Sequence, residues 1–180
     1  MIGEVKKILS SFILLALLIP GPVAHAQGQE VDLSESQLTL ITQNCTMTQG
    51  IIERVRSNDA LTRRDIGYQY ESIATKLMAP MNGRIALNGL DGVELQKTTI
   101  DFNKALDSFR KIYISHDQAE EKALQIDCRK KASDFYAAIG EARQYRQQVS
   151  DSVIRLQELV AQYRMQIDTF TDKISQGATK

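Results

Sequence analysis

His116 is the residue of this sequence best suited to do chemistry, because an acidic side chain follows it one helical turn later. Glu120 stands four positions beyond His116, and Asp117 and Glu121 stand next to these two residues. On a helix the imidazole and the Glu120 carboxylate would share one face, and they could hold a divalent cation if another helix donated ligands. His116 also falls on the apolar stripe of its segment, which favours a hydrogen-bonded histidine inside a bundle. We therefore expect no metal site and no cofactor.

Other catalytic patterns in the sequence are weak or absent. Ser108 and Lys111 have the S-x-x-K spacing of acyl-transfer enzymes, but no S-D-N or K-T-G companion occurs. The sequence also has no H-E-x-x-H, no G-x-S-x-G and no glycine-rich phosphate loop. We expect no catalytic residues, and we predict that the protein is not an enzyme.

Arg146 is the one charged residue in an otherwise apolar stripe that runs from Phe135 to Ile174. A guanidinium on a helix seam needs an acidic partner. In a three-helix register Arg146 lies level with about Tyr68, which places it near Asp65 and Glu71. We predict that these carboxylates pair with Arg146 and fix the helix register, as polar seam residues can do. A ligand carboxylate is the alternative partner.

The charge balance gives no indication of a nucleic-acid partner. The 22 basic residues equal the 22 acidic residues in number. Arginine-rich stretches are interleaved with Asp and Glu, which is typical of a solvated, ion-paired helix face. Because aromatic residues that could stack on bases are sparse among them, we expect no binding of nucleic acid.

The first 26 residues have the order of a secretory signal peptide. Lys6 and Lys7 precede an apolar run over residues 8–19, and a Pro-Gly-Pro break then leads to small residues ending at Ala26. The apolar run is shorter than the roughly 20 residues that span a bilayer, so a retained anchor is the weaker alternative. We predict cleavage after Ala26, no stable membrane span afterwards, and a secreted or periplasmic protein.

From Ser34 onward, apolar residues recur every three or four positions, which is the period of amphipathic helices. The pattern predicts helices over 34–88, about 92–127 and 133–177, with Ser133 as the N-cap of the last helix and Gly177 as its stop. We expect an all-α fold, a long antiparallel helical bundle or coiled coil at residues 34–177. A flexible segment at 27–33 precedes it and a tail at 178–180 follows it.

The number of helices depends on residues 56–60, which could form a turn or a polar patch within one helix. The three-four alternation continues through Asp59 without a change of phase, which favours three helices over four. One extra four-residue step follows Ile66, a stutter that locally unwinds a coiled coil. Pro80 should kink this first helix, because proline cannot donate a backbone hydrogen bond.

The two cysteines provide an independent test of this topology. In an exported chain Cys45 and Cys128 are expected to pair. With hairpin turns near residues 90 and 129, Cys128 lies level with about residue 52, within roughly 10 Å of Cys45 along the axis. In a four-helix arrangement the separation would be roughly 28 Å, too far for a disulfide. Two buried thiols are the alternative.

Several short stretches together resemble a group of uncharacterised secreted helical proteins of candidate-phyla (Patescibacteria) bacteria. The resemblance covers most of the mature chain and implies export and a helical bundle, without a known activity or functional residues. It is carried by Asn44-Cys45, residues 63–71 (RRDIGYQYE), residues 77–84 (LMAPMNGR), Asp127-Cys128, Phe135-Tyr136 and Ala142-Arg143.

We expect an exported, non-enzymatic coiled-coil or helical-bundle protein that acts as a protein–protein interaction or structural module. Its partner would be another protein or a second copy of itself. Apolar residues that flank the seams would form the binding surface unless a third helix covers them: Leu40, Met47 and Ile51 in the first helix, and Ile154, Leu159 and Met165 in the last. An extracytoplasmic bundle that binds a small ligand, or a chaperone-like bundle, is the alternative.

Overall fold

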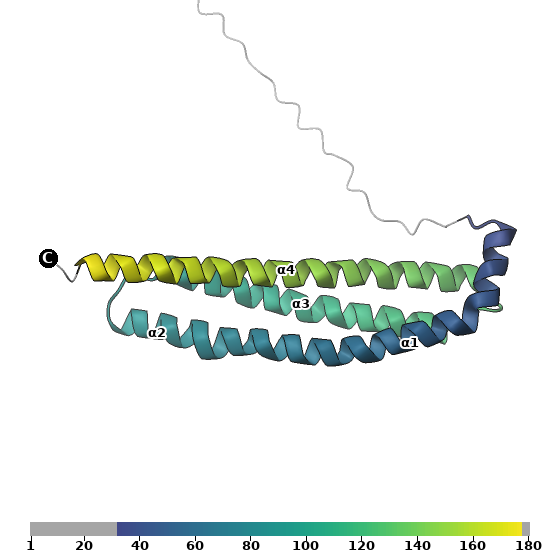
Figure 1. Cartoon of the computed structure of the whole chain (residues 1–180), viewed down its shortest axis with the longest axis horizontal. Coiled ribbons are helices and arrows are strands. Elements are labelled where there is room, and N and C mark those ends of the chain that lie inside the picture. Colours follow the sequence, from purple (N-terminus) through teal and green to yellow (C-terminus); the bar gives the residue numbers. More distant parts are fainter. Residues whose placement is uncertain (1–31, 178–180) are drawn as a thin grey trace, which may run out of the picture. The chain divides into compact units, whose positions relative to one another are not determined.

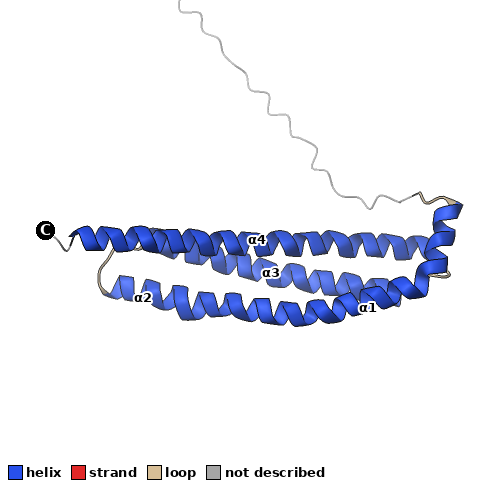
Figure 2. Ribbon diagram, in the orientation of Figure 1, coloured by secondary structure: helices blue, strands red, loops and turns tan. Residues whose placement is uncertain are grey.

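The computed structural model describes residues 32–177, and this part of the chain consists of helices joined by short loops (Figures 1 and 2). The elements are α1 (Glu35–Ser72), η1 (a π-helix, Ile73–Met78), α2 (Ala79–Leu87), α3 (Val93–Gln125) and α4 (Ala132–Gly177). The all-α helical bundle is confirmed. The predicted signal peptide at 1–26, most of the segment at 27–33 and the tail at 178–180 lie outside the described residues.

The segments α1, η1 and α2 follow one another without a turn, so they form one long helix that passes through Asp59 (Figure 1). The three-helix arrangement is therefore correct, and the four-helix alternative is wrong. A capping box starts α1: the Ser34 hydroxyl accepts from the Gln37 backbone N–H, and the Gln37 side chain accepts from the Ser34 N–H. The N-terminal part of α1 bends away from the direction of the remainder (Figure 1).

The irregularity near Pro80 takes the form of the π-helix η1. Because proline has no backbone N–H, the ladder of i to i−4 hydrogen bonds is interrupted at this position. The Ala79 N–H, one residue earlier, donates to the Ala74 carbonyl, five residues back. The widened turn just before Pro80 shifts the phase of the residues that follow. The stutter of the sequence pattern lies earlier, after Ile66, within the regular part of α1.

Two glycines shape the loop between α2 and α3. Gly89 has a φ of 65°, a left-handed conformation that costs glycine little. The Gly89 N–H donates to Ala86 and the Leu90 N–H donates to Ile85, the hydrogen bonds of a Schellman motif. At Gly92 a Cβ atom would lie 2.6 Å from the side chain of Ile85, so only glycine lets the loop approach α2 this closely.

At the other hairpin, α4 begins at Ala132, one residue earlier than the helix predicted from Ser133. Ser133 therefore lies in the first turn of α4 and is not its N-cap. The carbonyl of Asp127 accepts from the N–H groups of Lys130 and Lys131, which tightens the loop that leads into the helix. The predicted end of the helix at Gly177 agrees with the structure.

Buried side chains form two separate clusters. The main core draws on α1, η1, α2, α3 and α4 and contains Tyr70, Ala74, Met78, Ile85, Leu95, Phe102, Leu106, Phe109, Tyr113, Leu156, Leu159 and Tyr163. The second, which we call the disulfide cluster, contains Cys45, Ala123, Cys128, Phe135 and Ala138. No helix among the described residues is both long and apolar enough to cross a membrane.

Candidate functional site

A polar cluster lies inside the bundle, between α1 and the second half of α3. His116 and Glu120 come from successive turns of α3 and are only 2% and 5% exposed. Asp59 comes from α1 and is partly buried. One ligand atom from each of these three side chains lies within 4.8 Å of the other two. The Asp59 carboxylate of α1 thus lies beside His116 and Glu120, which share one face of α3 because they are four residues apart.

The hydrogen bonding of this cluster is incomplete. The Nε2 atom of His116 is 3.7 Å from Oε1 of Glu120, which is too long for a hydrogen bond. The other imidazole nitrogen, Nδ1, is buried and has no hydrogen-bond partner among the described residues. We expected a hydrogen-bonded histidine here; His116 is buried as expected, but its imidazole is not satisfied.

Burial and neighbouring charges shift the pKa values of these groups in opposite directions. Desolvation, reinforced by the negative charges of Asp59 and Asp117, raises the pKa of Glu120 to about 7. Desolvation lowers the pKa of His116, because burial disfavours the imidazolium. The imidazole and the carboxylic acid are therefore both driven toward their neutral forms when nothing else occupies the cluster.

Basic residues surround the polar cluster. Arg56 donates to both oxygens of Asp117 and also contacts Glu121, which joins α1 to α3 on the outer side. The Arg56 guanidinium lowers the pKa of the Asp117 carboxyl. Arg63 lies over the ring of Tyr113, 4.8 Å from the ring centroid. These contacts link α1 to α3 immediately beside the polar cluster.

Arg146 differs from the prediction in its surroundings. Its side chain is exposed, and it lines a cavity of about 200 Å³ together with Asp59 and His116. The predicted acidic partners belong to other basic residues: Asp65 pairs with Arg64 at 3.4 Å, and Glu71 pairs with Arg110. The predicted pairing of Arg146 with Asp65 and Glu71 is therefore wrong, and the structure does not bring these carboxylates to His116.

Asp59 is the residue of the cluster that the sequence analysis did not select. It occupies a position on the stripe of α1 where the neighbouring positions are mostly apolar. A charged residue on an apolar stripe is a sequence signal that could have identified Asp59 as a member of a buried polar cluster. Its distance from His116 depends on the register between two helices that are distant in sequence, so its role becomes visible only in the structure.

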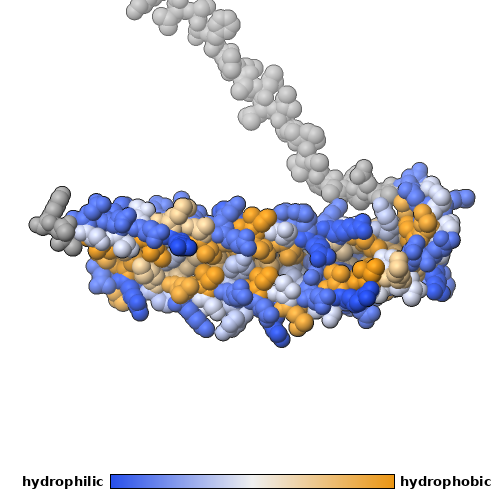
Figure 3. All heavy atoms as spheres, viewed as in Figure 1, coloured by the Kyte–Doolittle hydropathy of each residue, from blue (hydrophilic) through white to orange (hydrophobic). Residues whose placement is uncertain are grey.

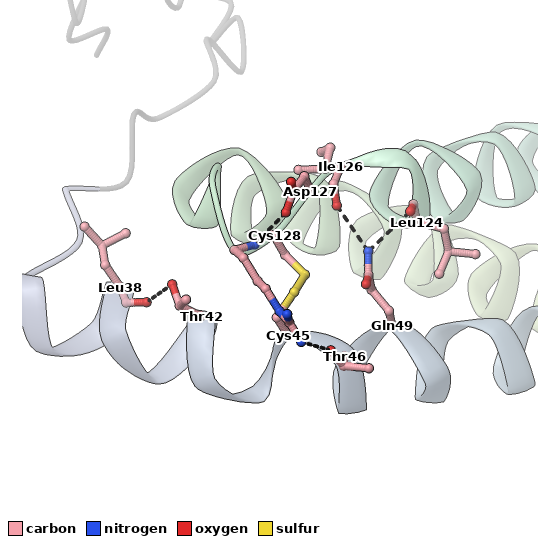
Figure 4. Close-up of a disulfide and its surroundings, with 10 residues drawn as sticks. Leu38, Thr42, Cys45, Thr46, Gln49, Leu124, Ile126, Asp127 and Cys128 are labelled. Atoms are coloured by element: carbon pink, nitrogen blue, oxygen red, sulfur yellow. Dashed lines mark hydrogen bonds between the residues drawn. A yellow bond between two sulfur atoms is a disulfide. The ribbon is translucent and has the colours of Figure 1, made fainter.

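The predicted disulfide between Cys45 and Cys128 is present, with Cα atoms 5.6 Å apart (Figure 4). It joins α1 to the loop between α3 and α4. Beside it, the Gln49 amide donates to the carbonyls of Leu124 at 3.3 Å and Ile126 at 3.1 Å, as Figure 4 shows. Covalent and polar contacts thus hold the end of α3 against the first helix.

An apolar groove lies at the opposite end of the bundle, with a volume of about 710 Å³. It lies between the loop after α2, the first turn of α3 and the last turns of α4. Its lining is mostly apolar and includes Leu90, Val93, Met165, Phe170 and Ile174. Hydrophobic atoms also gather at several places along the face that Figure 3 shows.

The residues predicted to flank the helix seams are mostly exposed. Leu40, Met47 and Ile51 of α1 are exposed, and so are Ile154 and Met165 of α4. Leu159 differs, because it is fully buried in the main core. No helix of the described chain covers the exposed residues, and among them Met165 alone lines the groove.

Comparison with protein-family models, with curated proteins and with solved structures finds no match to this chain. The resemblance to secreted helical proteins of Patescibacteria stays a prediction.

Proposed function

We propose that this protein is an exported, non-enzymatic helical-bundle module that associates with a second copy of itself through the apolar groove. The observation that supports this most directly is the continuation of α4 past the beginning of α3. Val93, the first residue of α3, lines the groove with Met165, and α4 runs on to Gly177. Apolar residues continue along this final stretch as Phe170 and Ile174.

Export is supported by the disulfide between Cys45 and Cys128, because such bonds persist in oxidising compartments and are rare in the cytosol. The sequence pattern of residues 1–26 supports the same location.

The charges around the groove favour a second copy as its occupant. Lys173 lines the groove on α4, while Asp91 and Glu94 line it on the other side. In a two-fold arrangement Lys173 of each copy would face the acidic side of its partner, as an isologous interface requires.

The size of the groove predicts a weak dimer. Met165 and Gly177 are 12 residues apart in sequence, which corresponds to about 18 Å at helical rise. Stable interfaces bury about 800 Å² on each partner, and a helix face of this length with one loop supplies less than that. We therefore expect a reversible dimer with a dissociation constant in the micromolar range, and not an obligate dimer.

Sedimentation of the full chain over a concentration series tests this proposal, with two matched variants on α4. Met165→Glu places a charge in the groove, while Ile154→Glu places one on the same helix away from the groove; the two residues are 63% and 51% exposed. We expect Met165→Glu to weaken dimerisation at least about 10-fold and Ile154→Glu to leave it unchanged. Both variants should keep the melting temperature, because the substituted side chains are exposed.

Two results would contradict the proposal. Equal weakening by both variants would show that the copies associate through another surface. A wild-type protein that stays monomeric at millimolar concentration would rule out the second copy and leave the groove to a helix of a different protein.

A further inference from the structure

The polar side chains buried in the main core differ from those around His116 in how well they are satisfied. Asn82 donates to the Thr99 hydroxyl at 2.7 Å and accepts from the Tyr163 hydroxyl at 3.1 Å, so this group is satisfied. At His116 the Nδ1 atom has no partner, and Nε2 is too far from Glu120 for a hydrogen bond. A buried polar group without a partner costs about 1 to 3 kcal/mol, so the imidazole of His116 destabilises the bundle unless a further group engages it.

We propose that Asp59, His116 and Glu120 bind a divalent transition-metal ion, with Zn²⁺ the best match to their chemistry. One imidazole and two carboxylates are the nitrogen and oxygen ligands that Zn²⁺ accepts. With metal–ligand bonds of about 2.0 to 2.2 Å, tetrahedral geometry places ligand atoms roughly 3.4 Å apart. The three ligand atoms lie within 4.8 Å of one another, so small side-chain rotations close the remaining gap.

The net charge of the three ligands also matches a divalent ion. A neutral imidazole and two carboxylates carry a charge of −2, which Zn²⁺ neutralises. Both carboxylates lie in a partly dehydrated region, and their mutual repulsion is the second cause of the raised pKa of Glu120. The cavity of about 200 Å³ next to His116 has room for a water as the fourth ligand.

The basic residues nearby are the alternative source of positive charge. Arg146 lines the same cavity and acts electrostatically on both His116 and Glu120. Its side chain is exposed, and it makes no hydrogen bond or ion pair with the three ligands within the described chain. Arg63 is engaged with the ring of Tyr113. Neither arginine donates a hydrogen bond to the imidazole within the described chain, so the buried Nδ1 stays without a partner.

The site would serve as a crosslink between α1 and α3 midway along their contact. Asp59 lies 14 residues beyond Cys45, so the ion would hold a part of α1 that the disulfide does not reach. This role does not depend on the apolar groove, which lies at the end of the bundle formed by the loop after α2.

Calorimetric titration of the full chain, without a histidine tag, with Zn²⁺ tests the site. His25→Ala in every sample leaves His116 as the only histidine. Glu120→Gln keeps the shape of the side chain and removes its charge, and Glu121→Gln is the matched control, because Glu121 is the exposed neighbour. We expect one Zn²⁺ per chain, at least about 10-fold weaker binding in Glu120→Gln, and unchanged binding in Glu121→Gln.

A second variant distinguishes the loss of a metal ligand from misfolding. Asp59→Asn changes a ligand on the other helix, and it should weaken Zn²⁺ binding as Glu120→Gln does while circular dichroism shows the same helix content. In NMR spectra the imidazole signals of His116 should shift on addition of Zn²⁺. Absence of binding at millimolar Zn²⁺, or equal binding by wild type, Glu120→Gln and Asp59→Asn, would overturn the proposal.

Discussion

The two ends of the bundle are closed in different ways. At one end the disulfide cluster contains few large side chains, with Phe135 beside two alanines and the bonded cysteines. Toward the other end, the main core includes Met78, Ile85 and Leu95, and aromatic side chains extend it along the bundle. Since apolar burial stabilises by about 25 cal/mol per Å², the disulfide cluster gains much less from packing than the main core.

The difference shows how each end compensates for what it lacks. Where packing is poor, a covalent bond and the Gln49 hydrogen bonds hold α1 against the end of α3. Where packing is extensive, the chain needs no crosslink, and α4 runs past its neighbour to leave a groove lined with apolar residues. The polar cluster at His116 lies between the disulfide cluster and the end of the bundle that carries the groove.

Among the changes that test this difference between the two ends, removal of the disulfide should lower the free energy of unfolding most. A bond that closes a loop of 83 residues stabilises by about 4 to 5 kcal/mol in the chain-entropy model. We expect the combined Cys45→Ser and Cys128→Ser substitution to lower the free energy of unfolding by about that amount, measured by urea denaturation. Hydrogen exchange should accelerate first in the N-terminal turns of α1, while the α2 amides stay protected.

The control for this prediction is the double variant with and without reductant, which should behave identically. Uniform acceleration of exchange over α1, α3 and α4 would contradict the idea that the two ends differ, because it would show a single cooperative unit that the bond stabilises as a whole.

The sequence was a good guide to the helices and to the covalent bond. The three-four alternation predicts helix bounds that agree with the structure to within a few residues, because every helix buries one face against others. Helical rise placed Cys128 within roughly 10 Å of Cys45, close enough to predict the bond, and the Cα atoms lie 5.6 Å apart in the structure. Such features depend on local periodicity and on counting along the axis.

The features that the sequence did not predict depend on rotation and register between helices. The stripe along α4 stays on the inner side of the helix, since Leu156 and Tyr163 are buried beyond Arg146. Leu159, assigned to the flank, is buried with them because the buried face of α4 is wider than a two-position seam. Arg146 is exposed because its long side chain can carry the guanidinium from this face to solvent. The proximity of Asp59 to His116 required the same information about register.

A cavity in the main core should have the second largest effect. Phe102 is completely buried, and it contacts Tyr70 edge to face with ring centroids 6.1 Å apart. We expect Phe102→Ala to lower the free energy of unfolding by about 3 to 5 kcal/mol, because no crosslink supports this part of the bundle. Thermal unfolding followed by circular dichroism measures it.

Ile100→Ala is the matched control, since Ile100 is two residues earlier on α3 and half exposed. It should cost less than about 1 kcal/mol. A comparable loss in both variants would mean that the main core does not carry the stability that its burial indicates.

Substitution of Gln49 should have the smallest effect, and it tests whether polar contacts matter at the disulfide end. The Gln49 amide satisfies the carbonyls of Leu124, in the last turn of α3, and of Ile126, the residue just after the helix, and neither carbonyl has a helical partner. We expect Gln49→Ala to lower the free energy of unfolding by about 1 to 2 kcal/mol, because it removes the only side-chain donor to these carbonyls within the described chain. Gln43→Ala, an exposed position on the same helix, should change the free energy of unfolding by less than about 0.5 kcal/mol.

In the protein without the disulfide, Gln49→Ala should cost less than it does in the bonded protein, since α1 then no longer stays in contact with α3. Equal costs in both backgrounds would show that the hydrogen bonds hold this end by themselves and that the disulfide is not what places Gln49 against the loop.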